Sequence, residues 1–204
     1  MATEIPDFFH KMKSLLKDAN THARVEGKNF FIQSFNRQGF LDENLKAWDK
    51  KQFNDSAGAI LIQSGALKRG IYSRSQGMER VMFGVDANIP HAKIHNEGGE
   101  IIVTAKMKRY FWYLYMQITG SKKEGAAGGQ LKGKYQYKKD GSKRNNKLNR
   151  ELGSKAEFYK AMACKKVGSV IHIPKRQFLG ESATLLREFD NWVIAEIERR
   201  FAEL

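Results

Sequence analysis

The stretch Ser121–Arg150 limits how this chain can fold more than any other feature of its sequence. It contains ten Lys or Arg and two Asp or Glu, so it carries +8 of the net charge of +14. A charge run of this kind is usually solvated, which indicates a basic, flexible insertion rather than a core element. The core must come from the residues on either side, and at 204 residues we expect a single domain, 1–204.

The first 40 residues predict a helical N-terminal region. Apolar residues recur at helical spacing in 5–19 and again in 25–35, and the second pattern stops near Gly39. We therefore expect two helices before the α+β body begins.

The body, residues 41–120 and 151–204, mixes helical and strand patterns. A short helix is expected to end at Gly65, and two strands should flank a turn at Gln76–Gly77. The other expected elements are a helical turn from Pro90, a strand at 100–105, a helix (or a strand) at 107–118, a helix at 155–167 and a strand at 169–173. "KRYFWYLYMQITG" and "AEFYKAMACKKVG" share an aromatic pair, a methionine and a final glycine, which indicates either two facing helices or coincidence.

The last segment predicts a long helix. Leu186, Phe189, Val193, Ile197 and Phe201 follow a 3-4-4-4 spacing, so one apolar face must pack on the sheet or on a neighbouring subunit. Glu196 and Arg200 add a favourable i,i+4 pair. The predicted fold class is α+β: a small, mostly antiparallel sheet packed against helices, with the basic loop as an insertion.

The amino-acid composition limits which binding partners and which cellular compartment we expect for this protein. The excess of 36 Lys+Arg over 22 Asp+Glu suggests an anionic partner without choosing among nucleic acid, membrane and acidic protein. The lone Cys164 cannot form an intramolecular disulfide, which favours a reducing compartment, and we expect it in the core. No stretch resembles a signal peptide or a membrane span, so we expect a soluble protein of the cell interior.

The sequence gives little support for a catalytic or metal-binding site. His91 and His95 stand at i and i+4, as zinc ligands do on a helix, but a third ligand would have to come from Glu97, Glu100 or His172. No nucleophile elbow and no phosphate-binding glycine loop is present. We expect no enzyme activity, no metal and no cofactor, and a zinc-dependent hydrolase is the least supported alternative.

Two glycine-centred corners stand out instead. In "IHNEGGEI", Gly98 or Gly99 can adopt a positive φ, and His95 with a glutamate is expected to hold the turn. In "HIPKRQFLGES", Pro174 should end a strand, Phe178 should enter the core and Gly180 should release the chain into the last helix.

The basic insertion offers a candidate contact surface for DNA or for an acidic partner. Its lysines could neutralise phosphates while a tyrosine stacks on a base, and a solvated loop without a ligand is the alternative. The candidate contacts are Lys132, Lys134, Tyr135, Tyr137, Lys138, Lys139, Lys143 and Arg144.

Taken in order, "NFFIQSFNRQGF", Trp48, "ILIQSGALKRGI", "MFGVDANIPHAKIHNEGGEI" and "IPKRQFLGES" resemble the phage virion morphogenesis (tail completion) proteins of Mu-like and P2-like phages. The resemblance extends from about residue 25 to the end of the chain, and "IHNEGG" and "IPKRQFLG" are its most specific stretches. The family-like positions are Gly65, Leu67, His95, Gly98, Gly99, Pro174, Arg176, Phe178, Leu179 and Gly180.

The resemblance implies an α/β virion subunit without catalytic activity. Such a subunit caps the end of a tail tube, often as a ring that is expected to be a hexamer, and joins it to the head connector. The implied partners are copies of itself, the tail tube, neck proteins and DNA in the lumen, with no membrane. It would reside in the virion neck, and in the host cytoplasm during assembly. The alternative is a nucleic-acid-binding module that acts through the loop 121–150, whose length departs from the short family members.

Overall fold

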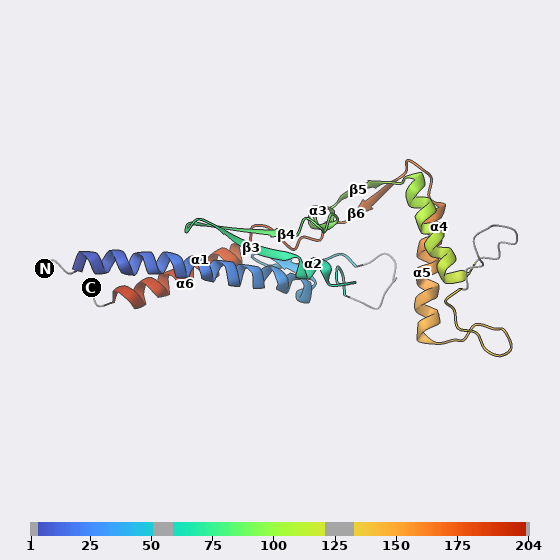
Figure 1. Cartoon of the computed structure of the whole chain (residues 1–204), viewed down its shortest axis with the longest axis horizontal. Coiled ribbons are helices and arrows are strands. Elements are labelled where there is room, and N and C mark those ends of the chain that lie inside the picture. The colour runs from blue at the N-terminus through green and yellow to red at the C-terminus, as the bar shows by residue number, and fades with distance from the viewer. Residues whose placement is uncertain (1–3, 51–58, 121–132, 203–204) are drawn as a thin grey trace. The chain divides into compact units, whose positions relative to one another are not determined.

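The structure is a computed structural model that describes residues 4–50, 59–120 and 133–202 (Figure 1). The predicted α+β class is confirmed, because helices at both ends of the chain enclose antiparallel strands in the sequence. The single small sheet that we expected is replaced by three two-stranded ladders in the described residues. Each strand is short and pairs only with its partner, so the ladders do not merge.

The helices are α1 (Glu4–Arg37), α2 (Ala66–Arg69), α3 (Ala92–Glu97), α4 (Ala105–Thr119), α5 (Lys147–Cys164) and α6 (Ala183–Phe201). The strands are β1 (Gly39–Leu41), β2 (Leu45–Ala47), β3 (Ile71–Gln76), β4 (Arg80–Val85), β5 (Gly99–Ile102) and β6 (Val170–Ile173). The pairs are β1–β2, β3–β4 and β5–β6, all antiparallel.

The described residues form two compact units where the length had led us to expect one domain. Unit 1 contains residues 4–49, 59–98 and 174–202, and unit 2 contains Lys50, 99–120 and 133–173. The chain passes into unit 2 between Gly98 and Gly99 and returns between Ile173 and Pro174. The inserted segment is therefore Gly99–Ile173, and the basic run is only its middle part.

A single helix replaces the two that were predicted at the N-terminus. α1 runs without a break for 34 residues because the stretch between the two apolar patterns contains neither Pro nor Gly. Gly27 is buried within it, and a Cβ there would lie 2.4 Å from the ring of Phe83 on β4. The missing side chain thus lets the β3–β4 hairpin approach α1.

The core of unit 1 gathers around aromatic rings from α1. Phe35 and Phe178 are fully buried with ring centroids 5.3 Å apart, and Trp48 packs edge-on against Phe35 at 5.5 Å. Leu67 and Ile71 belong to the same cluster, as do Phe30, Phe31, Phe40 and Ala92. The prediction that Phe178 enters the core is confirmed.

The β3–β4 hairpin and its turn at Gly77, with φ 72°, are confirmed. The helix predicted before Gly65 is wrong: residues 59–65 are irregular, 57 and 58 lie outside the described residues, and α2 begins after this glycine. Gly65 has φ 71°, a left-handed conformation that opens the helix instead of ending it. The β1–β2 ladder was not predicted.

In unit 2, α4 and α5 pack side by side, with Phe111 against Phe158 at 6.0 Å and Tyr159 at 6.1 Å (Figure 1). The two similar segments therefore do form facing helices. The expected loop 121–150 ends earlier than predicted, because Asn146 caps α5 and residues 147–150 are its first turn. Cys164, expected in the core, is exposed at the end of α5.

α4 is rich in apolar and aromatic residues but has only 15 residues. None of the helices in the described ranges is both long enough and apolar enough to cross a membrane.

The buried ring of Phe178 provides a direct test of the core. Phe178→Ala should lower the free energy of unfolding by about 3–5 kcal/mol, because the lost contacts leave a cavity between α1 and the returning chain. Urea unfolding followed by circular dichroism measures this change. Phe9→Ala is the control, since that ring is 66% exposed and its loss should cost far less. Equal midpoints for the two variants would contradict the assigned core.

Candidate functional site

The two glycine-centred corners meet in a single hydrogen-bonded joint, and Asn96 is its centre. The Oδ1 atom of Asn96 accepts hydrogen bonds from the backbone N–H groups of Phe178 and Leu179, both at 2.9 Å. Its Nδ2 atom donates to the carbonyl oxygen of Leu179 at 3.1 Å. One amide therefore binds both a donor pair and an acceptor on a segment more than eighty positions away in the chain.

The neighbouring residues extend the joint. The N–H of Arg176 donates to the carbonyl oxygen of His95 at 2.8 Å. The buried Arg176 guanidinium donates from Nε and Nη2 to the carbonyl oxygen of Asp49, at 3.1 and 3.0 Å. The indole Nε1 of Trp48 donates to the carbonyl oxygen of Gln177 at 2.7 Å. The returning segment is thus held to two separate parts of unit 1.

The expected role of His95 and a glutamate is wrong. The His95 Nδ1 atom is buried without a hydrogen-bond partner, and Glu97 is exposed and only 4.0 Å from Lys93. Glu100 instead pairs with His172 at 3.1 Å across the β5–β6 ladder. Asn96 holds the corner instead, because its neutral amide can donate and accept hydrogen bonds at once, which a carboxylate cannot do.

The glycines and the proline of the corners lie where the chain turns. Gly98 ends α3 at φ 77°, and Gly99 begins β5, which confirms a positive φ at this corner. Pro174 directly follows β6, as predicted. Gly180 has φ 151° and precedes the cap of α6.

The start of α6 is tied back to the end of β1. Ser182 caps α6 by accepting from the N–H of Leu185, and its hydroxyl donates to the carbonyl oxygen of Leu41 at 2.9 Å. The Asp42 carboxylate accepts from the N–H of Ala183 at 3.1 Å, and this bond, with help from Lys46, holds the pKa of Asp42 below its usual value. Leu179 lies half-buried against the core cluster beside this turn.

The proposed metal ligands do not form a metal centre in the described residues. The rings of His91 and His95 do share one side of α3, with centroids 5.7 Å apart. No group of three or more His, Cys, Asp or Glu side chains within the described ranges could hold an ion together.

The described part of the basic insertion is a folded loop anchored by Asn149. This buried side chain accepts from the N–H of Gln136 at 2.9 Å and donates to the carbonyl oxygens of Gln136 and Arg144, both at 2.7 Å. The Lys143 ammonium lies 3.9 Å from the centroid of the Tyr135 ring, and burial raises the pKa of Tyr135. Sequence reasoning missed Asn149, although the Asn-rich "RNNKLN" at a helix start was a signal for capping.

The candidate contacts in this loop divide by exposure. Lys132 lies outside the described residues. Tyr135 is half-buried, whereas the others are exposed to solvent: Lys134, Tyr137, Lys138, Lys139, Lys143 and Arg144. Arg144 Nε donates to the carbonyl oxygen of Tyr137 at 3.1 Å, so its position is fixed by the loop.

Unit 1 carries a large apolar groove that sequence reasoning only partly anticipated. The groove has a volume of about 840 Å³ and lies between α1, the β3–β4 hairpin and α6. The α6 face that was predicted to be apolar lines it with Leu186, Phe189, Val193 and Ile197. Leu186 is 60% exposed and Ile197 is 42% exposed, so this face is only partly covered within the chain.

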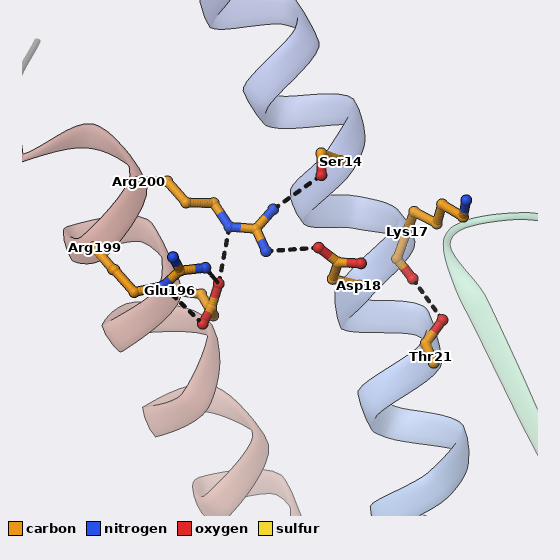
Figure 2. A network of polar contacts seen from close by, with 7 residues as sticks. All are labelled: Ser14, Lys17, Asp18, Thr21, Glu196, Arg199 and Arg200. Atoms are coloured by element: carbon orange, nitrogen blue, oxygen red, sulfur yellow. Dashed lines mark hydrogen bonds and ion pairs between the residues drawn. The ribbon is translucent and has the colours of Figure 1, made fainter.

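Polar contacts hold α6 against α1 beside the groove (Figure 2). Arg200 donates to Glu196 at 2.8 Å, to Asp18 at 2.6 Å and to Ser14 at 3.3 Å. The predicted Glu196–Arg200 pair is therefore confirmed, and it belongs to a network that joins the two helices. Trp192 stacks on His22 at 4.1 Å, so its ring packs on α1 while it lines the groove.

Comparison with protein-family models, with curated proteins and with solved structures finds no match to this chain. The joint ties the two corners of unit 1 to each other, whereas the groove leaves apolar side chains partly exposed and the loop leaves basic side chains exposed to solvent.

The joint can be tested at Asn96. Asn96→Leu removes one acceptor and one donor and leaves the N–H groups of Phe178 and Leu179 unpaired, each at a cost of about 1–3 kcal/mol. Urea unfolding should show this loss of stability. The matched control is Glu97→Leu on the same helix, which is exposed and should change stability by no more than about 0.5 kcal/mol. Equal stability of the two variants would refute the joint.

His95 should make the stability of unit 1 depend on pH. Burial, then the nearby His91 and Arg176, lowers the pKa of His95 in the folded state. The unfolded chain therefore binds a proton first as the pH falls through about 6.5, and stability decreases below that pH. His95→Gln should lose less stability than the wild type between about pH 7.5 and pH 5.5 in urea unfolding. Identical losses would show that His95 does not contribute.

Proposed function

We propose that this chain is a structural virion protein that completes a phage tail and mediates head–tail joining as a subunit of a ring. The observation that carries the proposal is the joint at Asn96. "IHNEGG" and "IPKRQFLG", the two stretches on which the family resemblance chiefly rests, bind one another directly. Two motifs that are unusual in sequence thus serve one structural purpose, as expected of a shared fold element.

The apolar groove of unit 1 supports assembly with further copies of this chain. Partly exposed side chains on α6 border it, and burial of such surface is the main driving force of association. Residues 1–49, 59–98 and 174–204 contain 17 Lys+Arg and 16 Asp+Glu, so unit 1 is close to neutral and self-association meets little charge repulsion. A ring requires a contact between two different surfaces whose rotation closes.

The proposal includes no catalytic activity and no cofactor. Its partners would be copies of itself, expected as a hexamer from the resemblance, and then the tail tube and the neck proteins. The protein would act in the virion neck after assembly in the host cytoplasm. A nucleic-acid-binding module acting through the loop 121–150 is the second candidate, favoured by the exposure of Lys138, Lys139 and Arg144.

Native mass spectrometry of nuclease-treated protein tests the ring. We expect a discrete ring-sized oligomer, and Leu186→Glu with Ile197→Glu should convert it to a monomer of unchanged helical content because charge enters the groove border. Val25→Glu is the matched control: Val25 lies on α1, is 51% exposed and does not line the groove.

The outcomes separate the two candidates. A wild-type monomer at every attainable concentration would contradict the ring. A monomer that carries oligonucleotide at low salt and releases it at high salt would favour the second candidate, because phosphate contacts weaken as salt rises. A ring disrupted equally by Val25→Glu would remove the groove as the contact surface.

A further inference from the structure

The positive charge of this protein belongs to the whole inserted segment and not only to the basic loop. Residues 99–173 contain 17 Lys+Arg and 5 Asp+Glu, which is +12 of the net +14. The helix α4 contributes Lys106, Lys108 and Arg109 and contains no acidic residue. A large field of one sign attracts polyanions and raises the rate at which they associate.

The exposed face of α4 combines this charge with aromatic rings. Lys106, Arg109, Tyr110 and Tyr113 recur at helical spacing and are all exposed, with Tyr110 57% and Tyr113 54% exposed. The opposite face packs toward α5 through Phe111 and buries Ile118 near its end. Exposed tyrosines are therefore not a by-product of packing, because the core contacts of α4 are made by other residues.

We infer that this face of α4 binds single-stranded nucleic acid. Lys106 and Arg109 would contact phosphates while Tyr110 and Tyr113 stack on bases. Aromatic stacking between positive charges is the mode by which proteins bind single strands without reading sequence. Duplex DNA offers no free base faces to the tyrosines, so single strands are the better match.

An anionic membrane fits this face less well. Helices that lie on membranes insert a broad face of Leu, Phe and Trp side chains. In α4, Phe111 contacts α5 and Ile118 is buried, so Trp112, at 46% exposure, is the one exposed side chain of that kind, whereas the stripe beside it carries two cations and two phenols. The basic loop fits single-stranded nucleic acid less well than α4 does. Lys138 and Lys139 are exposed there, but Tyr137 is the one exposed ring beside them on which a base could stack.

Fluorescence anisotropy of the full-length protein with labelled oligothymidylate of roughly 20 nucleotides tests the inference. Tyr110→Ala with Tyr113→Ala should weaken binding by about tenfold or more, with little change in salt dependence, because stacking is lost and no phosphate contact is removed. Lys106→Gln with Arg109→Gln should reduce the slope of log affinity against log salt by about 0.7 for each contact removed.

A matched control exists in unit 1. Tyr72 is 41% exposed on β3, and the Arg74 guanidinium lies 5.8 Å from its ring, so Tyr72→Ala with Arg74→Gln removes an equivalent pair outside the site. This variant should bind as the wild type does. The α4 variants alter exposed side chains only, and circular dichroism should show unchanged helix content.

Several results would overturn the inference. Loss of binding in Lys138→Gln with Lys139→Gln, but not in the α4 variants, would move the site to the loop. Equal affinity for a duplex of the same length would exclude stacking on single strands. Equal competition by polyglutamate would show a response to charge alone, and tighter binding to phosphatidylserine vesicles than to oligothymidylate would indicate a membrane surface. Each result is independent of ring formation, which is measured without nucleic acid.

Discussion

The hydrogen bonds of the Asn96 side-chain amide are the interaction on which the fold of unit 1 depends, because they join the residues before the inserted segment to the residues after it. A segment of 75 residues, Gly99–Ile173, leaves unit 1 directly after α3, and the chain returns only at Pro174. Closing so long a loop costs conformational entropy, and the ladder β5–β6 closes it at its own ends by pairing Gly99 with Ile173. Asn96 joins the two chain segments of unit 1 that border the insertion, because it binds Phe178 and Leu179 on the returning side. The buried ring of Phe178 then anchors the same point in the core.

Charge and apolar surface are separated along this chain. Unit 1 holds the aromatic core and a nearly neutral surface with the apolar groove, whereas the inserted segment holds +12. Charges of one sign repel each other, so a nearly neutral unit 1 would meet less repulsion in the proposed self-association than the inserted segment would. In the proposed neck ring, unit 1 would make the subunit contacts and the inserted segment would face a polyanion.

Much of the fold could be predicted because local patterns were consistent with it. The β3–β4 hairpin followed from alternation around Gly77, and the last helix followed from its spaced apolar residues. The predictions of secondary structure were wrong where the same residue or pattern is compatible with two local structures. Gly65 can end a helix or open one, and the gap between the two patterns in α1 needed no break because helical residues filled it. The separation of the strands into three ladders depends on long-range packing that periodicity does not reveal.

The sequence by itself determined the α+β class, most of the helices, the positive φ at the Gly98 corner and the place of Phe178 in the core, because each depends on local conformation or on apolar character. It also pointed to both corner motifs. Only the tertiary structure decided that the corners bind each other, that Asn96 rather than His95 joins them, and that Tyr110 and Tyr113 are exposed together on one face. Those features require distances between residues far apart in the chain or the direction of each side chain, and a linear pattern contains neither.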